Sequence, residues 1–188
     1  MENIINYSER YELVTSVTAA DLAIAVCEKI CIDLILMDIA VNGTLDGIEA
    51  SVKIKLLFPE VKIVIVTSML DDLCLSRAKD AGVDSLWYKD TSKEDLLAVM
   101  DAAMRGEASF PDSTPKVMLG SSNNKELTQR ENIILREIVK GLSNKQIAEK
   151  CGIAEDTVNW HVKNLLAKTG LVNRTMLAIS AVQGNLFI

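Results

Sequence analysis

Residues 33–43 read DLILMDIAVNG, an apolar run that ends in one acid, Asp38. A short continuous apolar run is typical of a strand buried on both faces of a parallel sheet. Doubly wound sheets place their functional groups at the carboxyl ends of such strands. The stretch therefore predicts a buried strand with a carboxylate at its tip, and the rest of the chain must indicate which chemistry that carboxylate serves.

Strand-like and helix-like segments alternate on both sides of this run. We expect strands at 11–17, 33–39, 62–68 and 85–89, and helices at 20–30, 46–58, 71–82 and 92–106. Such alternation indicates an α/β domain, with a parallel sheet covered by helices on both faces.

The chain changes character after residue 110. Residues 111–124, PDSTPKVMLGSSNN, are rich in Pro, Gly, Ser and Thr and show no period, which predicts a linker. Beyond it the strand pattern ends, and helices are expected at 126–142, 143–151, 154–170 and 173–184. The expected organisation is thus an α/β domain at 1–110, the linker 111–124, and an all-α domain at 125–188.

The composition is that of an ordinary globular protein, with 49% hydrophobic and 24% charged residues in a chain of 188. No apolar run is long enough to span a membrane, and the N-terminal MENIINYSER has no secretory pattern. The four cysteines form no CxxC pair and the chain has one His, so the cysteines are interpreted as reduced and no metal site is expected from them. We therefore expect a cytoplasmic protein that contacts no membrane.

The net charge of the chain changes sign near the end of the predicted linker. From Asn124 onward nine basic and six acidic residues give a net charge of +3, and because the whole chain has 20 basic and 26 acidic residues, the part before it has a net charge of −9. Two regions of opposite sign suggest two domains with different partners. The basic region is the candidate for binding nucleic acid.

Three polar residues stand at the ends of three predicted strands: Asp38, Thr67 and Lys89. Because the carboxyl ends of parallel strands meet at one edge of a sheet, these side chains should converge. An Asp carboxylate there can attack phosphorus, a Thr hydroxyl can bond a phosphoryl oxygen, and a Lys ammonium can neutralise one. Any one of them alone could be a solvated strand end, but the three together favour a phosphoryl site.

Residues 143–162, SNKQIAEKCGIAEDTVNWHV, fit two helices joined by a tight turn. Ser143 suits a helix N-cap, and Gly152 supplies the turn. The residues expected to fill the core around this turn are Ile147, Ala148, Ile153, Val158, Val162 and Leu165. An ordinary helical hairpin needs no such spacing, so the pattern favours a helix-turn-helix.

The same spacing predicts an outward face. If Val158, Val162 and Leu165 are buried, then the side chains that point to solvent are Asn159, Trp160 and Lys163. Residues near the start of a recognition helix reach base edges. Lys163 could bind guanine or a phosphate, Asn159 adenine, and Trp160 a thymine methyl; the alternative for Trp160 is partial packing on a neighbouring helix.

Four motifs resemble the LuxR-type DNA-binding domain: LTQRE at 127–131, GLSNKQIA at 141–148, EDTVNWHVKNLLAKTG at 155–170 and NRT at 173–175. The resemblance implies a four-helix domain whose third helix enters the major groove of double-stranded DNA and whose fourth, about 173–183, mediates dimerisation. It implies a structural role for His161, the only His. The expected DNA-binding residues are Asn144, Thr157, Asn159, Trp160, Lys163 and Lys168.

The first half resembles the receiver domain of two-component response regulators through LILMDI, DGIEA at 46–50, IVIVTS and AGVDSLWYKD at 81–90. With the second domain, the whole chain resembles the NarL/FixJ class. The resemblance implies a flavodoxin-like fold with Asp38 as phosphoacceptor, Thr67 as switch hydroxyl and Lys89 as phosphate-binding lysine. It also implies a sensor histidine kinase as a partner.

The chain departs from the receiver pattern near its start. A receiver begins with an apolar strand and two adjacent acids that hold Mg²⁺, whereas ENIINYSER leads directly into what would be the second family strand. Asp71 and Asp72 are adjacent but are expected to begin a helix. No cofactor is therefore expected, with Mg²⁺ binding only if a longer chain or a partner supplies the acids, and phosphorylation control should be weakened or lost.

The expected fold is incomplete as well. In the strand order 2-1-3-4-5 the absent strand is the central one, which leaves backbone groups of its neighbours unpaired. Three arrangements could satisfy them: residues 11–17 pair with 33–39, another chain fills the gap, or the natural protein is longer.

These observations predict a non-enzymatic, sequence-specific transcriptional regulator of the response-regulator type, which binds double-stranded DNA as a homodimer. The alternative is a protein-interaction module that heterodimerises with another regulator and sequesters it. A DNA-binding titration at several salt concentrations would separate the two.

Overall fold

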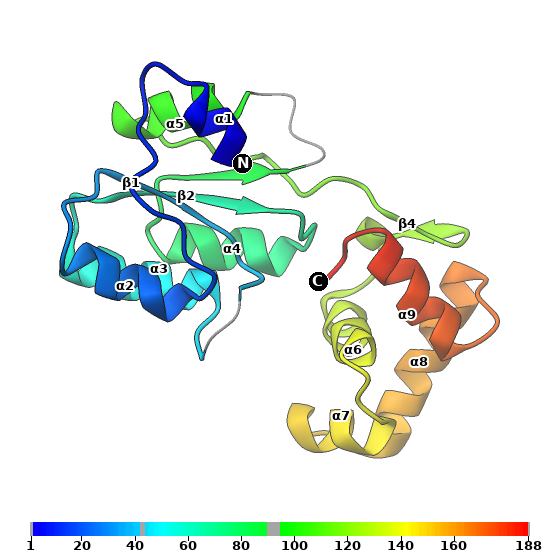
Figure 1. Ribbon diagram of the computed structural model, residues 1–188. Helices are drawn as coiled ribbons and strands as arrows, with labels where there is room; N and C mark the ends of the chain where they lie inside the picture. The colour runs from blue at the N-terminus through cyan, green and yellow to red at the C-terminus, as the bar shows by residue number, and fades with distance from the viewer. Residues whose placement is uncertain (1, 42–43, 90–94, 188) are drawn as a thin grey trace. The chain divides into compact units, whose positions relative to one another are not determined.

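The computed structural model describes residues 2–41, 44–89 and 95–187. The chain divides into two compact units (Figure 1). Unit 1 consists of Met1–Thr67 and Leu75–Pro111, and unit 2 consists of Ser68–Cys74 and Asp112–Ile188. Each unit has its own core and is described by itself. Within the described residues, no helix combines the length and the apolar character needed to cross a membrane.

Unit 1 is built on a parallel sheet of β1 (Leu34–Met37), β2 (Lys62–Thr67) and β3 (Ser85–Tyr88), in that order. Leu34 pairs with Lys62 at one end, and Thr67 pairs with Tyr88 at the other. These are three of the four predicted strands, and their parallel pairing confirms the α/β class.

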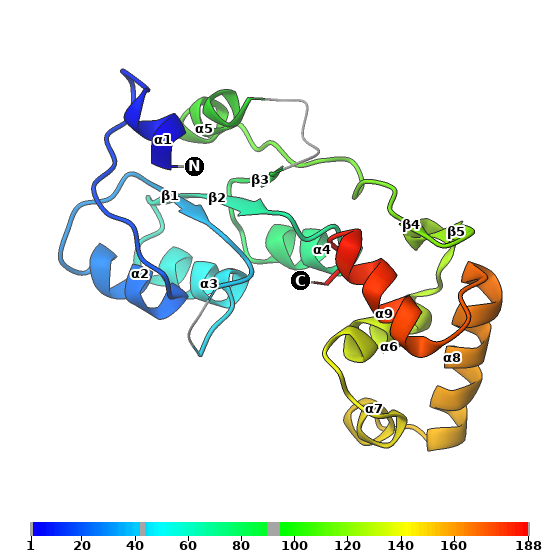
Figure 2. The same ribbon diagram turned by 45° about the vertical axis from the view of Figure 1, so that its right-hand side comes forward.

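Helices cover both faces of this sheet. Figures 1 and 2 show α1 (Glu2–Asn6) and α5 (Leu96–Met104) on one side, and α2 (Ala20–Cys27) and α3 (Gly47–Leu57) on the other. The side chains of β2 alternate between the two layers, as strand geometry requires. Val64 and Val66 pack in the cluster with α5, so Ile63 and Ile65, which are also fully buried, face the opposite layer.

The predicted strand at 11–17 is wrong, because residues 9–17 take no helix or strand. Tyr11 explains where this segment goes instead. Its ring packs against the α5 cluster, and its hydroxyl donates to Asp101 Oδ1 at 2.8 Å. Burial, with the hydrogen bond to the Asp101 carboxylate, raises the pKa of Tyr11 to about 12. Residues 12–18 that follow are exposed.

This segment therefore does not slide across to pair with 33–39, which removes the first of the three arrangements. In the part of the chain that the structure describes, β1 pairs with β2 alone, and its other edge has no neighbouring strand. The predicted helix at 92–106 appears as α5, but residues 92–94 of the prediction lie outside the described residues. The predicted helix at 71–82 appears as α4, which spans Asp72–Asp80.

Unit 2 contains the four predicted helices (Figure 2): α6 (Gln129–Val139), α7 (Asn144–Cys151), α8 (Glu155–Thr169) and α9 (Arg174–Gln183). Their core is closely packed and apolar. Its fully buried members include Ile134, Leu135, Ile147, Val158, Leu165 and Leu177.

Part of the segment predicted as a linker is folded into unit 2. Residues 118–123 form a small antiparallel hairpin of β4 (Met118–Leu119) and β5 (Ser122–Asn123), followed by the 3-10 turn η1 (Asn124–Glu126). The hairpin is tied to the end of α8, where the Ser121 N–H donates to the Thr169 carbonyl at 2.8 Å. Gly120 makes this approach possible, because a Cβ at that position would stand 2.1 Å from the same carbonyl oxygen.

Candidate functional site

The carboxyl edge of the sheet in unit 1 brings the three predicted residues together. Asp38 follows β1, Thr67 ends β2, and Lys89 follows β3. The Lys89 ammonium donates to Asp38 Oδ2 at 2.7 Å, and the Lys89 N–H donates to the Thr67 carbonyl at 3.0 Å. Asp38 and Lys89 are half-buried, whereas Thr67 is only 1% exposed. The edge thus holds an ion pair between the predicted phosphoacceptor and the predicted phosphate-binding lysine.

The start of α3 lies against this edge. A Cβ on Gly47 would stand 1.8 Å from the Asp38 carbonyl oxygen, so no residue with a side chain fits here without a shift of the backbone. Asp46 starts α3 with a capping box, in which its carboxylate accepts from the Ile48 and Glu49 N–H groups at 2.9 and 2.8 Å. The DG pair at 46–47 therefore fixes the position of α3 relative to Asp38.

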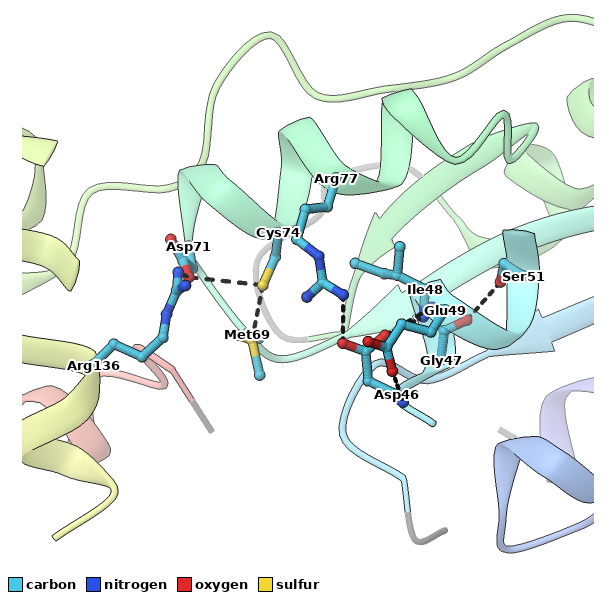
Figure 3. Close-up of polar contacts among 10 residues, drawn as sticks. All are labelled: Asp46, Gly47, Ile48, Glu49, Ser51, Met69, Asp71, Cys74, Arg77 and Arg136. Carbon is cyan, nitrogen blue, oxygen red and sulfur yellow. Dashed lines mark hydrogen bonds and ion pairs between the residues drawn. The ribbon is translucent and has the colours of Figure 1, made fainter. Parts of the chain in front are cut away.

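Figure 3 shows a further contact at this helix start, from Arg77 of α4. The Arg77 guanidinium donates to the free oxygen of the Asp46 carboxylate at 2.6 Å. Asp46 is thus occupied by the first turn of α3 and by Arg77 together. Sequence reasoning did not identify Arg77, because an ion pair between two helices leaves no signal in the spacing of either one.

The carboxylates of the described residues do not fit a Mg²⁺ site. No three His, Cys, Asp or Glu side chains gather there in a metal-binding arrangement. The second oxygen of Asp38 accepts the Ala40 N–H at 3.3 Å. Asp46 is committed to α3 and Arg77. These hydrogen bonds compete with the coordination that Mg²⁺ requires from carboxylate oxygens.

Asp71 and Asp72 begin a helix, as predicted, and are not available as ligands either. Asp71 accepts the Leu73 N–H at 3.0 Å, and α4 begins at Asp72. Within unit 2, Asp71 is buried and forms an ion pair with Arg136 (Figure 3). Asp72 forms an ion pair with Lys125 at 2.7 Å.

The second candidate site is the helix-turn-helix of α7 and α8 in unit 2. Ser143 caps α7 through a capping box with Gln146, and Gly152 ends it with a φ of +64° in the left-handed region. Ile147 and Ala148 are buried, as predicted, so α7 and α8 pack closely. These features confirm the predicted turn and place the start of α8 at Glu155.

The outward face of α8 is also as predicted. Val158 and Leu165 are fully buried, and this orientation leaves Asn159 and Lys163 exposed. Trp160 is 59% exposed, so its indole is largely open to solvent. Its ring and that of His161 form a T-shaped pair, with ring centroids 4.8 Å apart. Thr157 is exposed in the first turn of the helix.

Three of the six predicted DNA-binding residues have hydrogen-bond partners within the protein: Asn144, Asn159 and Lys168. The Lys168 ammonium donates to the buried carboxylate of Glu131 at 2.7 Å, so the geometry gives no support to a contact between Lys168 and DNA. The half-buried Asn144 accepts a hydrogen bond from Arg174 at 2.8 Å. Arg174 was not predicted as a functional residue, although it belongs to the NRT motif at 173–175.

Two families match the two halves of the chain. Residues 1–101 match the response regulator receiver domain, and residues 125–181 match the bacterial regulatory proteins of the luxR family. The chain therefore belongs to the response regulators that carry a LuxR-type DNA-binding domain.

Among individual proteins, the chain is similar to the response regulator protein VraR of Staphylococcus aureus. The two are 39% identical over 172 residues, which cover 87% of this chain and 80% of VraR.

Solved structures of the response regulator RcsB share the fold, among them structures of the protein from Salmonella enterica serovar Typhimurium. One contains RcsB bound to a promoter in the presence of phosphomimetic BeF3-, with a TM-score of 0.58 and 22% identity over 96% of this chain and 91% of that one. Another contains two RcsB dimers bound to two parallel DNAs, with a TM-score of 0.57 and 21% identity over 96% of this chain and 90% of that one.

Proposed function

We propose that this response regulator is a sequence-specific transcriptional regulator that reads duplex DNA through the outward face of α8, which consists of Thr157, Asn159, Trp160 and Lys163. The observation that carries this proposal is the 59% exposed indole of Trp160 on a helix whose opposite side is locked into the core. A mostly exposed indole buries little apolar surface in the fold, whereas in a major groove it can contact a thymine methyl. Lys163, one turn further along α8 and also exposed, adds the positive charge that DNA requires.

The test is a titration with operator DNA, selected from a random library, at several salt concentrations. Lys163→Ala should weaken binding by about 1–3 kcal/mol, as the loss of one base or phosphate contact does. Trp160→Ala should change the sequence preference more than the non-specific affinity. Lys116→Ala is the matched control, because it removes the same charge from an exposed site outside α8. If both α8 variants bind like the wild type, the sequestering alternative is favoured.

We propose further that the protein acts in the cytoplasm as a homodimer, with a sensor histidine kinase as its upstream partner. An exposed apolar face on α9 supports self-association, formed by Met176, Ile179 and Val182. The RcsB dimers on DNA offer a precedent within the same fold. The proposed domain limits are 1–110 for the receiver-like part, 111–124 for the connecting segment, of which 118–123 form the hairpin, and 125–188 for the DNA-binding part.

Control by phosphorylation of Asp38 is proposed to be weak. An incoming phosphoryl dianion meets the Asp38 carboxylate, and the Lys89 ammonium at 2.7 Å is the full positive charge beside it. The described carboxylates offer no Mg²⁺ site to neutralise the remaining negative charge of the phosphoryl group and Asp38. Phosphoryl transfer depends on such neutralisation.

Mass spectrometry after incubation with acetyl phosphate and Mg²⁺ tests this proposal. We expect little or no stable phosphorylation, and Asp38→Ala should leave DNA binding nearly unchanged. A phosphate-sized mass increase that Asp38→Ala abolishes, or a gain in DNA affinity that depends on the phosphodonor, would contradict it.

A further inference from the structure

Three polar side chains form a continuous hydrogen-bonded chain across unit 2, from α9 through α7 to the exposed face of α8. Arg174 Nη1 donates to Asn144 Oδ1 at 2.8 Å. Asn144 Nδ2 in turn donates to Asn159 Oδ1 at 2.6 Å. A charged side chain next to the core is thereby connected to a residue of the proposed DNA-reading surface.

The chemistry of arginine fixes which groups donate and which accept along this hydrogen-bonded chain. A guanidinium has only donors and no acceptor, so Asn144 must turn its amide oxygen toward Arg174. The Asn144 NH₂ group then faces Asn159, which must turn its own oxygen inward to accept. The orientation of both amides follows from the presence of Arg174, and it leaves the NH₂ group of Asn159 directed outward.

The Arg174 end of this hydrogen-bonded chain is anchored. Arg174 is held by a second hydrogen bond, from Nη2 to the Leu142 carbonyl at 2.7 Å, just before α7. Arg174 and Asn144 are half-buried and stand in the first turns of α9 and α7, which Asn173 and Ser143 cap. Only Asn159 is exposed. The positive charge at the buried end polarises the amides in series and makes the outward NH₂ group a stronger donor.

We propose that Arg174 and Asn144 act as positioning residues that set the base preference of α8, by holding Asn159 as a hydrogen-bond donor. The inference rests on the proposed function, because it assumes that α8 lies in the major groove. A donor selects an acceptor, and the guanine edge offers two acceptors, N7 and O6. The adenine pairing expected from the sequence needs both groups of an Asn amide. Here the oxygen of Asn159 already accepts from Asn144, so the preference moves toward guanine.

One substitution reverses the polarity of the chain. In Asn144→Asp the introduced carboxylate still accepts from Arg174, but it can no longer donate to Asn159. Asn159 then turns its NH₂ group inward and its oxygen outward. The expected result is a change of about tenfold in relative affinity at one base position, away from guanine and toward a base that presents a donor, cytosine or adenine. Competitive selection from a randomised library, followed by sequencing, measures this directly.

Three control variants and circular dichroism separate the orientation of Asn159 from effects of charge and folding. The introduced carboxylate also repels DNA, so Asn144→Asp should be compared with the double variant Asn144→Asp/Asn159→Ala, in which overall affinity falls but no reversal occurs. Arg174→Lys keeps a donor toward Asn144 and should retain the wild-type preference. Arg174→Met removes that donor and should weaken the base preference. Circular dichroism establishes whether each variant is folded.

The acceptor on the DNA can be a base or a phosphate oxygen, and modified operators distinguish these sources. Replacing the contacted guanine by 7-deazaguanine should weaken the wild type but not Asn159→Ala. A methylphosphonate linkage could instead weaken binding by the wild type but not by Asn159→Ala, while 7-deazaguanine changes neither. Asn159 would then bind the DNA backbone, and the inference about base preference would be overturned. It is equally overturned if wild type and Asn144→Asp select the same sequences. A wild-type protein that binds no DNA refutes the proposed function itself.

Discussion

Gly47 is the residue on which the geometry of the Asp38 edge depends most directly. In the interior of an exposed helix, replacing Gly by Ala stabilises by about 1 kcal/mol through helix propensity. At this position a Cβ would stand 1.8 Å from the Asp38 carbonyl oxygen. Gly47→Ala should therefore destabilise unit 1 by about 1–3 kcal/mol, as overpacking does.

The measurement is urea unfolding in a Trp160→Phe background. The protein has two tryptophans, and Trp87 in β3 then reports on unit 1 alone. Lys53→Ala, exposed on the same helix, should change the free energy of unfolding by no more than about 0.5 kcal/mol. A Gly47→Ala variant more stable than the wild type would show that α3 can move away from Asp38.

Single residues were predictable where their position follows from a strand end or a helix period. Asp38, Thr67 and Lys89 lie at strand tips, and the alternation of apolar segments was sufficient to place them. Arg77 and Arg174 were not predictable, because their partners are 31 and 30 residues away in the chain. Long side chains reach such partners because tertiary packing brings the helices together. A local sequence pattern does not predict that packing.

At the scale of elements, α6 and α8 are joined by a carboxylate in the core of unit 2. Glu131 is buried and accepts from Lys168 at 2.7 Å and from the Thr128 N–H at 2.7 Å. Burial by itself raises the pKa of Glu131, but the hydrogen bonds from Lys168 and Thr128 outweigh it, so that the pKa is lowered below its ordinary 4.5. The ionised form therefore stabilises the folded state.

A carboxyl with a lowered pKa contributes its full stability above the ordinary value and loses it as the pH falls through the folded-state pKa. Glu131→Gln should thus destabilise unit 2 at pH 7, and the difference from wild type should shrink below about pH 4.5. Trp160 fluorescence during urea unfolding, in a Trp87→Phe background, follows unit 2. Glu149→Gln, exposed on α7, is the control. A difference that stays constant from pH 7 to pH 3 would contradict this assignment.

The elements that sequence reasoning placed wrongly or missed are those whose structure depends on distant partners. Residues 11–17 alternate like a strand, but Tyr11 binds α5, and the segment remains outside the sheet. The strands of the 118–123 hairpin have two residues each, too short to show a period, and the hairpin is held by the end of α8. The long helices of unit 2 were predicted well, because caps and apolar spacing agree within each of them.

At the scale of the whole molecule, self-association should depend on α9. Ile179 is 43% exposed on the apolar face of that helix. A charge placed there opposes burial against a second copy, so Ile179→Asp should shift the protein from dimer to monomer at micromolar concentration. Sedimentation velocity measures the distribution.

Val52→Asp is the matched control for this prediction, because Val52 is an apolar residue of α3 with 40% exposure. It introduces the same charge on unit 1 and should leave the distribution unchanged. If Val52→Asp dissociates the dimer and Ile179→Asp does not, self-association runs through the receiver-like part. A wild type that sediments as a monomer would remove the homodimer from the proposal.

The open edge of β1 has a consequence for the colloidal behaviour of the protein. The strand is LILM, four apolar residues whose outer edge has no partner among the described residues, and such edges template intermolecular sheet growth. Asp33 and Asp38 flank it as charged gatekeepers that oppose this growth. Near the pI of about 4.9 the net electrostatic repulsion between molecules vanishes. Precipitation should therefore be fastest near pH 5, and Asp38→Ala, which removes one gatekeeper, should aggregate sooner than the wild type at neutral pH.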